Sequence, residues 1–167
     1  MMRGVLIRLM TVGLLGLQAG VSWAATNDPL LGYWRTIDDE TGFAKAIVQI
    51  QEAQNGSYLS TIVATVDRPD YIAAEKCINC PAPFTDRKII GLPLLWNLRT
   101  MDQTGRGGEK RYDKGYLIDP LSGKFYQIAA RLSADGRRLT LRGHIIGIPL
   151  VGRTQTWLRD TTYTPTK

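Results

Sequence analysis

Cysteine and histidine are scarce in this chain of 167 residues, which contains two cysteines and one histidine. A four-thiolate zinc site therefore cannot form within one chain. The single histidine, His144, is far from Cys77 and Cys80 in the sequence, so a mixed metal site is not expected either. A catalytic histidine also needs a nucleophile, and no serine lies in a Gly-x-Ser-x-Gly turn. We expect no metal site and no catalytic residue, and we interpret His144 as an ordinary strand residue.

The sequence also lacks the patterns of nucleotide and nucleic-acid binding. The glycine-rich segment 105–108 is without the lysine, strand and helix that make a phosphate-binding loop or a dinucleotide fingerprint. The formal net charge of +6 at pH 7 comes from scattered basic residues that are not interleaved with aromatic residues. We therefore expect no cofactor and no nucleic-acid partner.

The first 24 residues have the features of a secretory signal peptide. Arg3 and Arg8 give a positive start, residues 9–17 form a short apolar run, and Ser22 and Ala24 place small side chains before a cleavage site. The apolar run is well short of the ~20 residues that a membrane-spanning helix needs, and no other segment is long and apolar enough. We expect residues 1–24 to be removed and the protein to be exported, either to the periplasm or out of the cell. Residues 25–167 then have the length of a single domain, without a transmembrane segment.

From Gly32 onward, short apolar or alternating segments are separated by turn residues. Residues 43–52 alternate with period two, and Asn55-Gly56 follows them, which predicts a half-buried strand and a tight hairpin. Segment 67–88 contains three prolines and both cysteines and is predicted to be a long connection, while 102–108 is a loop and 147–152 a bend. The expected strands are residues 32–37, 43–52, 57–66, 94–100, 111–118, 125–132, 138–146 and 153–159.

About eight short strands joined by short turns, without a long amphipathic helix, predict an all-β domain. Because segments that are neighbours in sequence pair in space, the order is expected to be up-and-down and antiparallel. Eight such strands can close into a single β-barrel and leave no exposed edge. In such a barrel the first and last strands meet, so we expect Trp34 to be paired with Arg153 and Arg159. An arginine stacked on an indole ring is worth ~0.5–2 kcal/mol.

Two motifs resemble known proteins. Gly-x-Trp on the first strand with a basic residue on the last resembles the lipocalin and calycin barrels. The segments G-x-W-x-T-x-D at residues 32–38 and G-R-T-Q-x-W at residues 152–157 resemble a domain-of-unknown-function family of secreted and periplasmic bacterial proteins. The resemblance implies a lipocalin-like barrel and an exported location, and it implies no particular reaction.

Two local clusters allow more than one interpretation. Asp38, Asp39 and Glu40 are either a carboxylate site or a turn with solvated acids, and we favour the turn because adjacent acids point in different directions. Cys77 and Cys80 are expected to form a structural disulfide in an exported chain, with a thiol-redox pair as the alternative.

The aromatic residues of the predicted strands either line a ligand cavity or fill a packed core, because barrels of this size do both. The candidate ligand-binding residues are Trp96, Tyr116, Tyr126, Gln155 and Trp157. We expect a non-enzymatic barrel that binds a small apolar or amphipathic ligand. The alternatives are a packed barrel that docks an envelope protein through its outer surface or its long loop at 67–88, and a thiol oxidoreductase that uses the cysteine pair.

Overall fold

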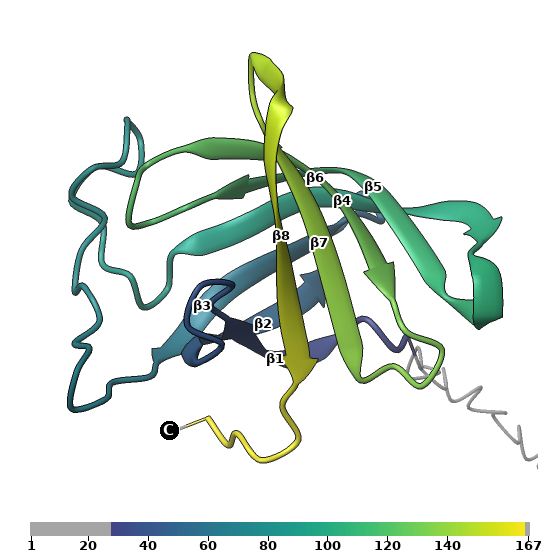
Figure 1. Ribbon diagram of the computed structural model, residues 1–167, viewed down its shortest axis with the longest axis horizontal. Coiled ribbons are helices and arrows are strands. Elements are labelled where there is room, and N and C mark those ends of the chain that lie inside the picture. The colour runs from purple at the N-terminus through teal and green to yellow at the C-terminus, as the bar shows by residue number, and fades with distance from the viewer. Residues whose placement is uncertain (1–27, 166–167) are drawn as a thin grey trace, which may run out of the picture.

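The computed structural model describes residues 28–165, apart from the side chains of residues 149–151, and the predicted signal peptide lies outside this part. Residues 28–165 form one closed antiparallel barrel of eight strands in up-and-down order, which confirms the predicted fold (Figure 1). The strands are β1 (Gly32–Ile37), β2 (Ala44–Glu52), β3 (Tyr58–Thr65), β4 (Pro93–Thr104), β5 (Lys110–Ile118), β6 (Phe125–Leu132), β7 (Arg138–Ile145) and β8 (Ile148–Arg159). Within these residues no helix has the length and apolar character needed to span a membrane.

Two strands are longer than the sequence predicts. β8 begins at Ile148, which pairs with Ile145, so the expected bend at 147–152 is a tight turn followed by an irregular strand. β4 runs to Thr104, which pairs with Lys110, and the expected loop at 102–108 shrinks to a short 3-10 turn at Arg106–Gly108. Glycines in both segments, and a proline in 147–152, are typical of loops, but pairing with the neighbouring strand keeps part of each segment extended.

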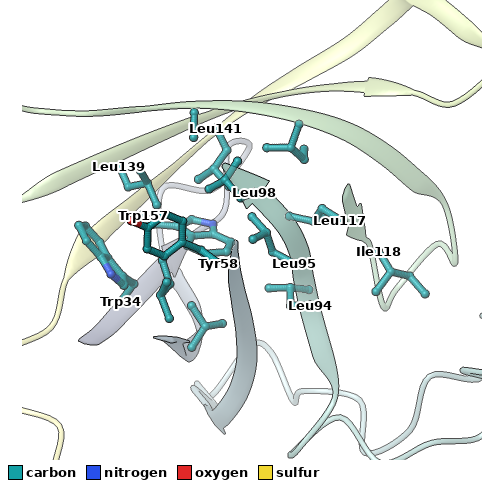
Figure 2. Packing of buried hydrophobic residues seen from close by; sticks show 14 of the residues in the cluster. Trp34, Tyr58, Leu94, Leu95, Leu98, Leu117, Ile118, Leu139, Leu141 and Trp157 are labelled. Atoms are coloured by element: carbon teal, nitrogen blue, oxygen red, sulfur yellow. The ribbon is translucent and has the colours of Figure 1, made fainter. Parts of the chain in front are cut away.

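The inner face of the barrel follows the alternation of the strands. On β6 the buried side chains are Tyr126, Ile128, Ala130 and Leu132, with exposed residues between them. Tyr126 and Ile128 pair with Leu117 and Gly115 of β5, and therefore share a face with them. The aromatic part of the core is concentrated toward one end, where Trp34, Tyr58 and Trp157 lie together (Figure 2). The rings of Tyr58 and Tyr112 meet edge to face with centroids 5.7 Å apart.

This end of the barrel is closed by Trp34 and Arg159. Trp34 is fully buried, and its indole Nε1 donates a hydrogen bond of 2.9 Å to the carbonyl oxygen of Leu30. The guanidinium of Arg159 lies 4.2 Å from the centre of the Trp34 ring. Arg159 also donates to the carbonyl oxygens of Gly136 at 2.7 Å, Leu31 at 3.0 Å and Pro29. One arginine thereby joins the last strand to the segment before β1 and to the β6–β7 turn.

Arg153, the second arginine predicted to pair with Trp34, does not do so. It lies near the start of β8, whereas Arg159 ends that strand, and its guanidinium binds Asp39 of the β1–β2 turn instead. The correction has a geometric reason: the two arginines share a face of β8, but six residues of extended chain place them near opposite ends of the barrel.

Asp160, directly after β8, holds the chain end against the barrel and is expected to make stability depend on acid pH. Its Oδ2 accepts a hydrogen bond of 2.8 Å from Arg35, and its Oδ1 accepts one of 2.8 Å from the Thr162 amide. Burial raises the pKa of Asp160, but the hydrogen bonds from Arg35 and Thr162 outweigh this effect, and the pKa falls from an ordinary 3.8 to about 2. A carboxyl with a depressed pKa stabilises the fold above its unfolded-state pKa, and loses this contribution as the pH falls toward its folded-state value.

We therefore expect Asp160 to contribute about 2 kcal/mol above pH 4, and this contribution to vanish between pH 4 and pH 2. Urea unfolding of the wild type and of Asp160→Asn at several pH values measures it. The two proteins should differ at pH 6 and converge near pH 2. An equal difference at both pH values would contradict the assignment.

The long β3–β4 connection lies at one end of the barrel and carries the cysteine pair (Figure 1). The sulfur atoms of Cys77 and Cys80 are at disulfide distance, and both residues are buried. The amide of Cys77 donates to the carbonyl oxygen of Arg87 at 2.9 Å, which makes the loop double back on itself. From this loop, Phe84 stacks on Trp96 of β4 with ring centroids 5.9 Å apart. The loop is thus anchored to the barrel wall by an aromatic contact.

Reducing this disulfide is expected to have a small effect on the barrel. The closed loop spans about four residues. For a loop of this length, the lower entropy of the cross-linked unfolded chain stabilises the fold by only ~2 kcal/mol. Urea unfolding of the oxidised and the reduced wild-type protein, followed by tryptophan fluorescence, tests this. A loss above about 4 kcal/mol would show that the bridge supports the barrel itself rather than the loop.

Candidate functional site

The end opposite Trp34 contains a pocket of about 130 Å³. Its deep part is lined by apolar residues of the inner face, and its entrance is formed by the β1–β2, β3–β4 and β5–β6 connections. The apolar lining residues of the strands include Ala46, Ile62, Leu94, Leu117, Ile118, Tyr126, Ile128 and Leu141, of which Figure 2 shows Leu94, Leu117 and Ile118 apart from the aromatic end. The barrel is therefore filled at one end and hollow at the other.

The volume of the pocket limits what it can hold. An apolar protein cavity of about 150 Å³ accommodates one benzene molecule. Pockets for drug-sized ligands are larger, roughly 300–1,000 Å³. A pocket of about 130 Å³ thus takes one small ring or a short alkyl chain, and a larger ligand must leave its remaining atoms at the entrance.

Gly143 of β7 contributes to the shape of the pocket wall. A Cβ atom at this position would lie 2.9 Å from Cδ1 of Ile128 and 3.3 Å from Cβ of Tyr126. Both neighbours line the pocket, so a larger residue here would push them out of place. The sequence pattern gave no sign of this role, because the inner face of β7 could not be matched to its neighbours before the register was known.

Charged side chains surround the entrance, and the first pair is Asp38 with Lys45. Asp38 is only 4% exposed, and its Oδ1 accepts hydrogen bonds from the amide and the hydroxyl of Thr41 at 2.8 and 2.7 Å. Its Oδ2 forms an ion pair with Nζ of Lys45. Burial raises the pKa of Asp38, but the hydrogen bonds from Lys45 and Thr41 outweigh this, so that the pKa lies well below its usual range. Asp38 is ionised and fully paired.

The second group at the entrance is Arg153 with two carboxylates. Arg153 donates from Nε to Oδ2 of Asp39 at 3.0 Å and from Nη2 to Oδ1. Its Nη1 lies 3.9 Å from Oδ2 of Asp119. The hydrogen bond from Arg153 lowers the pKa of Asp39, and the same contact raises the pKa of Arg153.

The acidic cluster therefore differs from the expected turn with solvated acids. A turn is present, in which the amide of Gly42 donates to the carbonyl oxygen of Asp38 at 2.8 Å. Asp39 and Glu40 are exposed as expected, but Asp38 is buried, and Asp38 and Asp39 bind cations of β2 and β8. These partners depend on strand register and barrel closure, which the local sequence does not contain.

The predicted ligand-binding residues divide into three groups. Tyr126 and Gln155 line the pocket. Trp157 is fully buried, but it packs with Trp34 and Leu139 in the closed end rather than in the pocket (Figure 2). Trp96 and Tyr116 are paired on the outer face of β4 and β5, where their rings stack with centroids 6.2 Å apart.

The outward position of Trp96 and Tyr116 corrects the expectation that they could line a cavity. Their neighbours Leu95 and Leu117 are buried on the inner face. The outer face is also apolar at this place, because Phe84 and Phe125 cover Trp96. Asn97 of β4 and Lys114 of β5 have positive φ values of 57° and 58°. At each of these residues the regular alternation of inward and outward side chains is therefore interrupted. For both reasons the sequence alone does not show which side chains of β4 and β5 point into the barrel.

Among residues 28–165, no group of three or more histidine, cysteine, aspartate or glutamate side chains could hold a metal ion. The cysteine pair is also buried, at 0% and 4% exposure, whereas reactive cysteines lie at partly exposed, electropositive positions. The pocket-lining residues that the sequence did not indicate as site residues include Lys45, Ala46, Ile62, Asp119 and Gly143.

The closed eight-stranded up-and-down barrel, filled at one end and hollow at the other, is of the lipocalin-like class. The chain belongs to a bacterial family described as "Uncharacterized protein conserved in bacteria (DUF2147)", whose match covers residues 32–159. That range runs from the glycine of the Gly-x-Trp motif to Arg159, and so includes both residues that close the barrel.

A solved structure with a similar fold is described as "Protein HP1028 from the human pathogen Helicobacter pylori belongs to the lipocalin family". It has a TM-score of 0.61 and 22% sequence identity, over 80% of this chain and 84% of that chain. At this identity the likeness concerns the fold. No curated protein shows a significant match to the chain.

Proposed function

We propose that this protein is an exported, non-enzymatic carrier that binds a small apolar or amphipathic ligand in the pocket at the open end of the barrel. The observation that carries the proposal is the pocket itself, with an apolar interior of about 130 Å³ and a charged entrance. Apolar walls with a few polar groups are typical of small-molecule sites. Export rests on the signal-peptide features of residues 1–24.

The electrostatics of the entrance support binding rather than acid–base catalysis. A carboxylate pair that performs such catalysis needs one member with a raised pKa, so that it can donate a proton near neutral pH. At this entrance the pKa values of Asp38 and Asp39 are both lowered, because Lys45 and Arg153 hold them as carboxylates. Neither residue is available as a general acid.

Mass spectrometry of the exported protein tests the proposal. The protein is purified without detergent, measured under native conditions, and measured again after extraction with organic solvent. We expect a mass increment that disappears on extraction, together with an apolar or amphipathic molecule in the extract. An apo mass, combined with no binding of short-chain alcohols by the same preparation, would contradict the carrier function.

The long loop offers a second candidate, docking of an envelope protein. Its side chains Ile72 and Ile78 are 84% and 69% exposed, although isoleucine is among the residues most often buried. Cross-linking in the envelope with the wild type and with Ile72→Ser/Ile78→Ser tests this alternative. A cross-linked species that needs the two isoleucines would favour docking, and an unchanged pattern would leave the carrier as the better proposal.

A further inference from the structure

We propose that the entrance of the pocket selects ligands whose polar head donates hydrogen bonds and is neutral or positively charged, and that it rejects anionic amphipaths such as alkyl carboxylates. This inference rests on the proposed carrier function and names the class of ligand that the carrier takes. Two observations support it: the balance of charges around the entrance, and the hydrogen bonds that the charged side chains there already make.

The charged residues at the entrance carry an excess of negative charge. The charged side chains that line the pocket are Asp38, Lys45, Asp119 and Arg153, and Asp39 is bound directly to Arg153. These are three carboxylates and two cations, so one negative charge remains uncompensated. Arg68, a cation of the long loop, lies 4.0 Å from the ring centre of Phe43 and 5.7 Å from that of Tyr71, and it does not itself line the pocket.

Both cations of the entrance are already engaged. Lys45 binds the buried Oδ2 of Asp38, and Arg153 presents Nε and Nη2 to the two oxygens of Asp39. A two-pronged arginine–carboxylate pair is among the strongest charge-assisted contacts in proteins. An incoming carboxylate would compete with Asp38 for Lys45 or with Asp39 for Arg153, and would lie close to that like-charged group. Each cation that lines the pocket therefore already has a carboxylate partner, and an anionic head would meet that carboxylate as well as the cation.

Asp119, in contrast, has acceptor capacity to spare. Its Oδ1 accepts a hydrogen bond of 3.0 Å from the Leu121 amide, and its Oδ2 accepts one of 2.8 Å from the Ser122 hydroxyl. The distance of 3.9 Å to Arg153 is too long for a hydrogen bond. A carboxylate has about four acceptor positions. Because Asp119 lines the pocket, it can receive a donor from an ammonium, amide or hydroxyl head whose alkyl part lies inside.

The test compares three probes with the same alkyl chain, namely hexylammonium, 1-hexanol and hexanoate, at pH 7 and low salt. Binding is followed by NMR titration of the wild-type protein. We expect hexylammonium and 1-hexanol to bind at least tenfold more tightly than hexanoate. Hexanoate binding as tight as that of hexylammonium would overturn the head-group proposal and leave the carrier function intact. Failure of all three probes to bind would overturn both.

The variant Asp119→Asn removes the uncompensated charge and keeps the shape of the side chain. Hexylammonium should bind about tenfold more weakly to it, and hexanoate more tightly, while 1-hexanol changes less than threefold. The matched control is Asp135→Asn, because Asp135 holds the β6–β7 turn at the closed end with a similar hydrogen bond, of 2.6 Å, from Ser133. Equal effects of the two variants would overturn the role of Asp119.

Discussion

Replacing Trp34 by alanine is expected to lower the free energy of unfolding by about 3–5 kcal/mol, the range for large aromatic residues removed from a core. Trp34 is fully buried, and it contacts the segment before β1 through Leu30 as well as the last strand through Arg159. Its loss leaves a cavity and removes the hydrogen-bond donor of the Leu30 carbonyl oxygen. It also removes the aromatic ring on which the Arg159 guanidinium stacks. Urea unfolding followed by circular dichroism measures the change.

Trp34→Phe is the matched control for this prediction. The phenyl ring keeps a surface on which the guanidinium of Arg159 can stack, but it cannot donate to the Leu30 carbonyl oxygen. We therefore expect a loss of about 1–2 kcal/mol, in the range of one buried hydrogen bond left unmade. If Trp34→Ala costs less than about 1 kcal/mol, the closed end does not depend on this residue and the barrel is held together elsewhere.

The strands could be predicted where the alternation of side chains and the turn chemistry agree. β6, at Phe125–Leu132, is an example, because four inward side chains alternate between polar turns, and the structure has the same bounds. β8 shows the limit of such patterns. Glycine and proline at 147–152 resemble a bend, but pairing with β7 extends the strand to Ile148. Pairing is a property of two strands, so one segment alone does not indicate it.

The site was less predictable than the fold, because it depends on long-range contacts. Arg153 and Asp39 are 114 residues apart, and they meet because β8 returns to β1. Tyr126 and Gln155 were recognised as inward candidates from local alternation. The long loop covers the outer face of the barrel near Trp96, so this face also carries the large aromatic side chains Trp96 and Tyr116. In the sequence these residues cannot be told apart from inward-facing ones. Only the register distinguishes the two faces.

Replacing Ala46 by phenylalanine is expected to abolish ligand binding while the barrel stays folded. Ala46 lies on β2, lines the pocket, and pairs with Thr65 of β3. A phenyl ring is the size of a benzene molecule, and a cavity of about 150 Å³ holds one such molecule. The new side chain would therefore occupy nearly all of the space of about 130 Å³. The hydrogen bonds that link Thr36 to Ala46 use backbone atoms of Ala46 and are unaffected.

The measurement is NMR titration with 1-hexanol, together with thermal unfolding of the same samples. We expect no detectable binding by Ala46→Phe and an unfolding free energy within about 1 kcal/mol of the wild type, because filling a cavity offsets the strain of the larger side chain. The control is Ala129→Phe, which adds the same ring on the exposed outer face of β6 and should bind like the wild type. If folded Ala46→Phe still binds 1-hexanol with the wild-type affinity, the ligand enters elsewhere, and the open groove beside Ile72 and Ile90 of the long loop becomes the site to test.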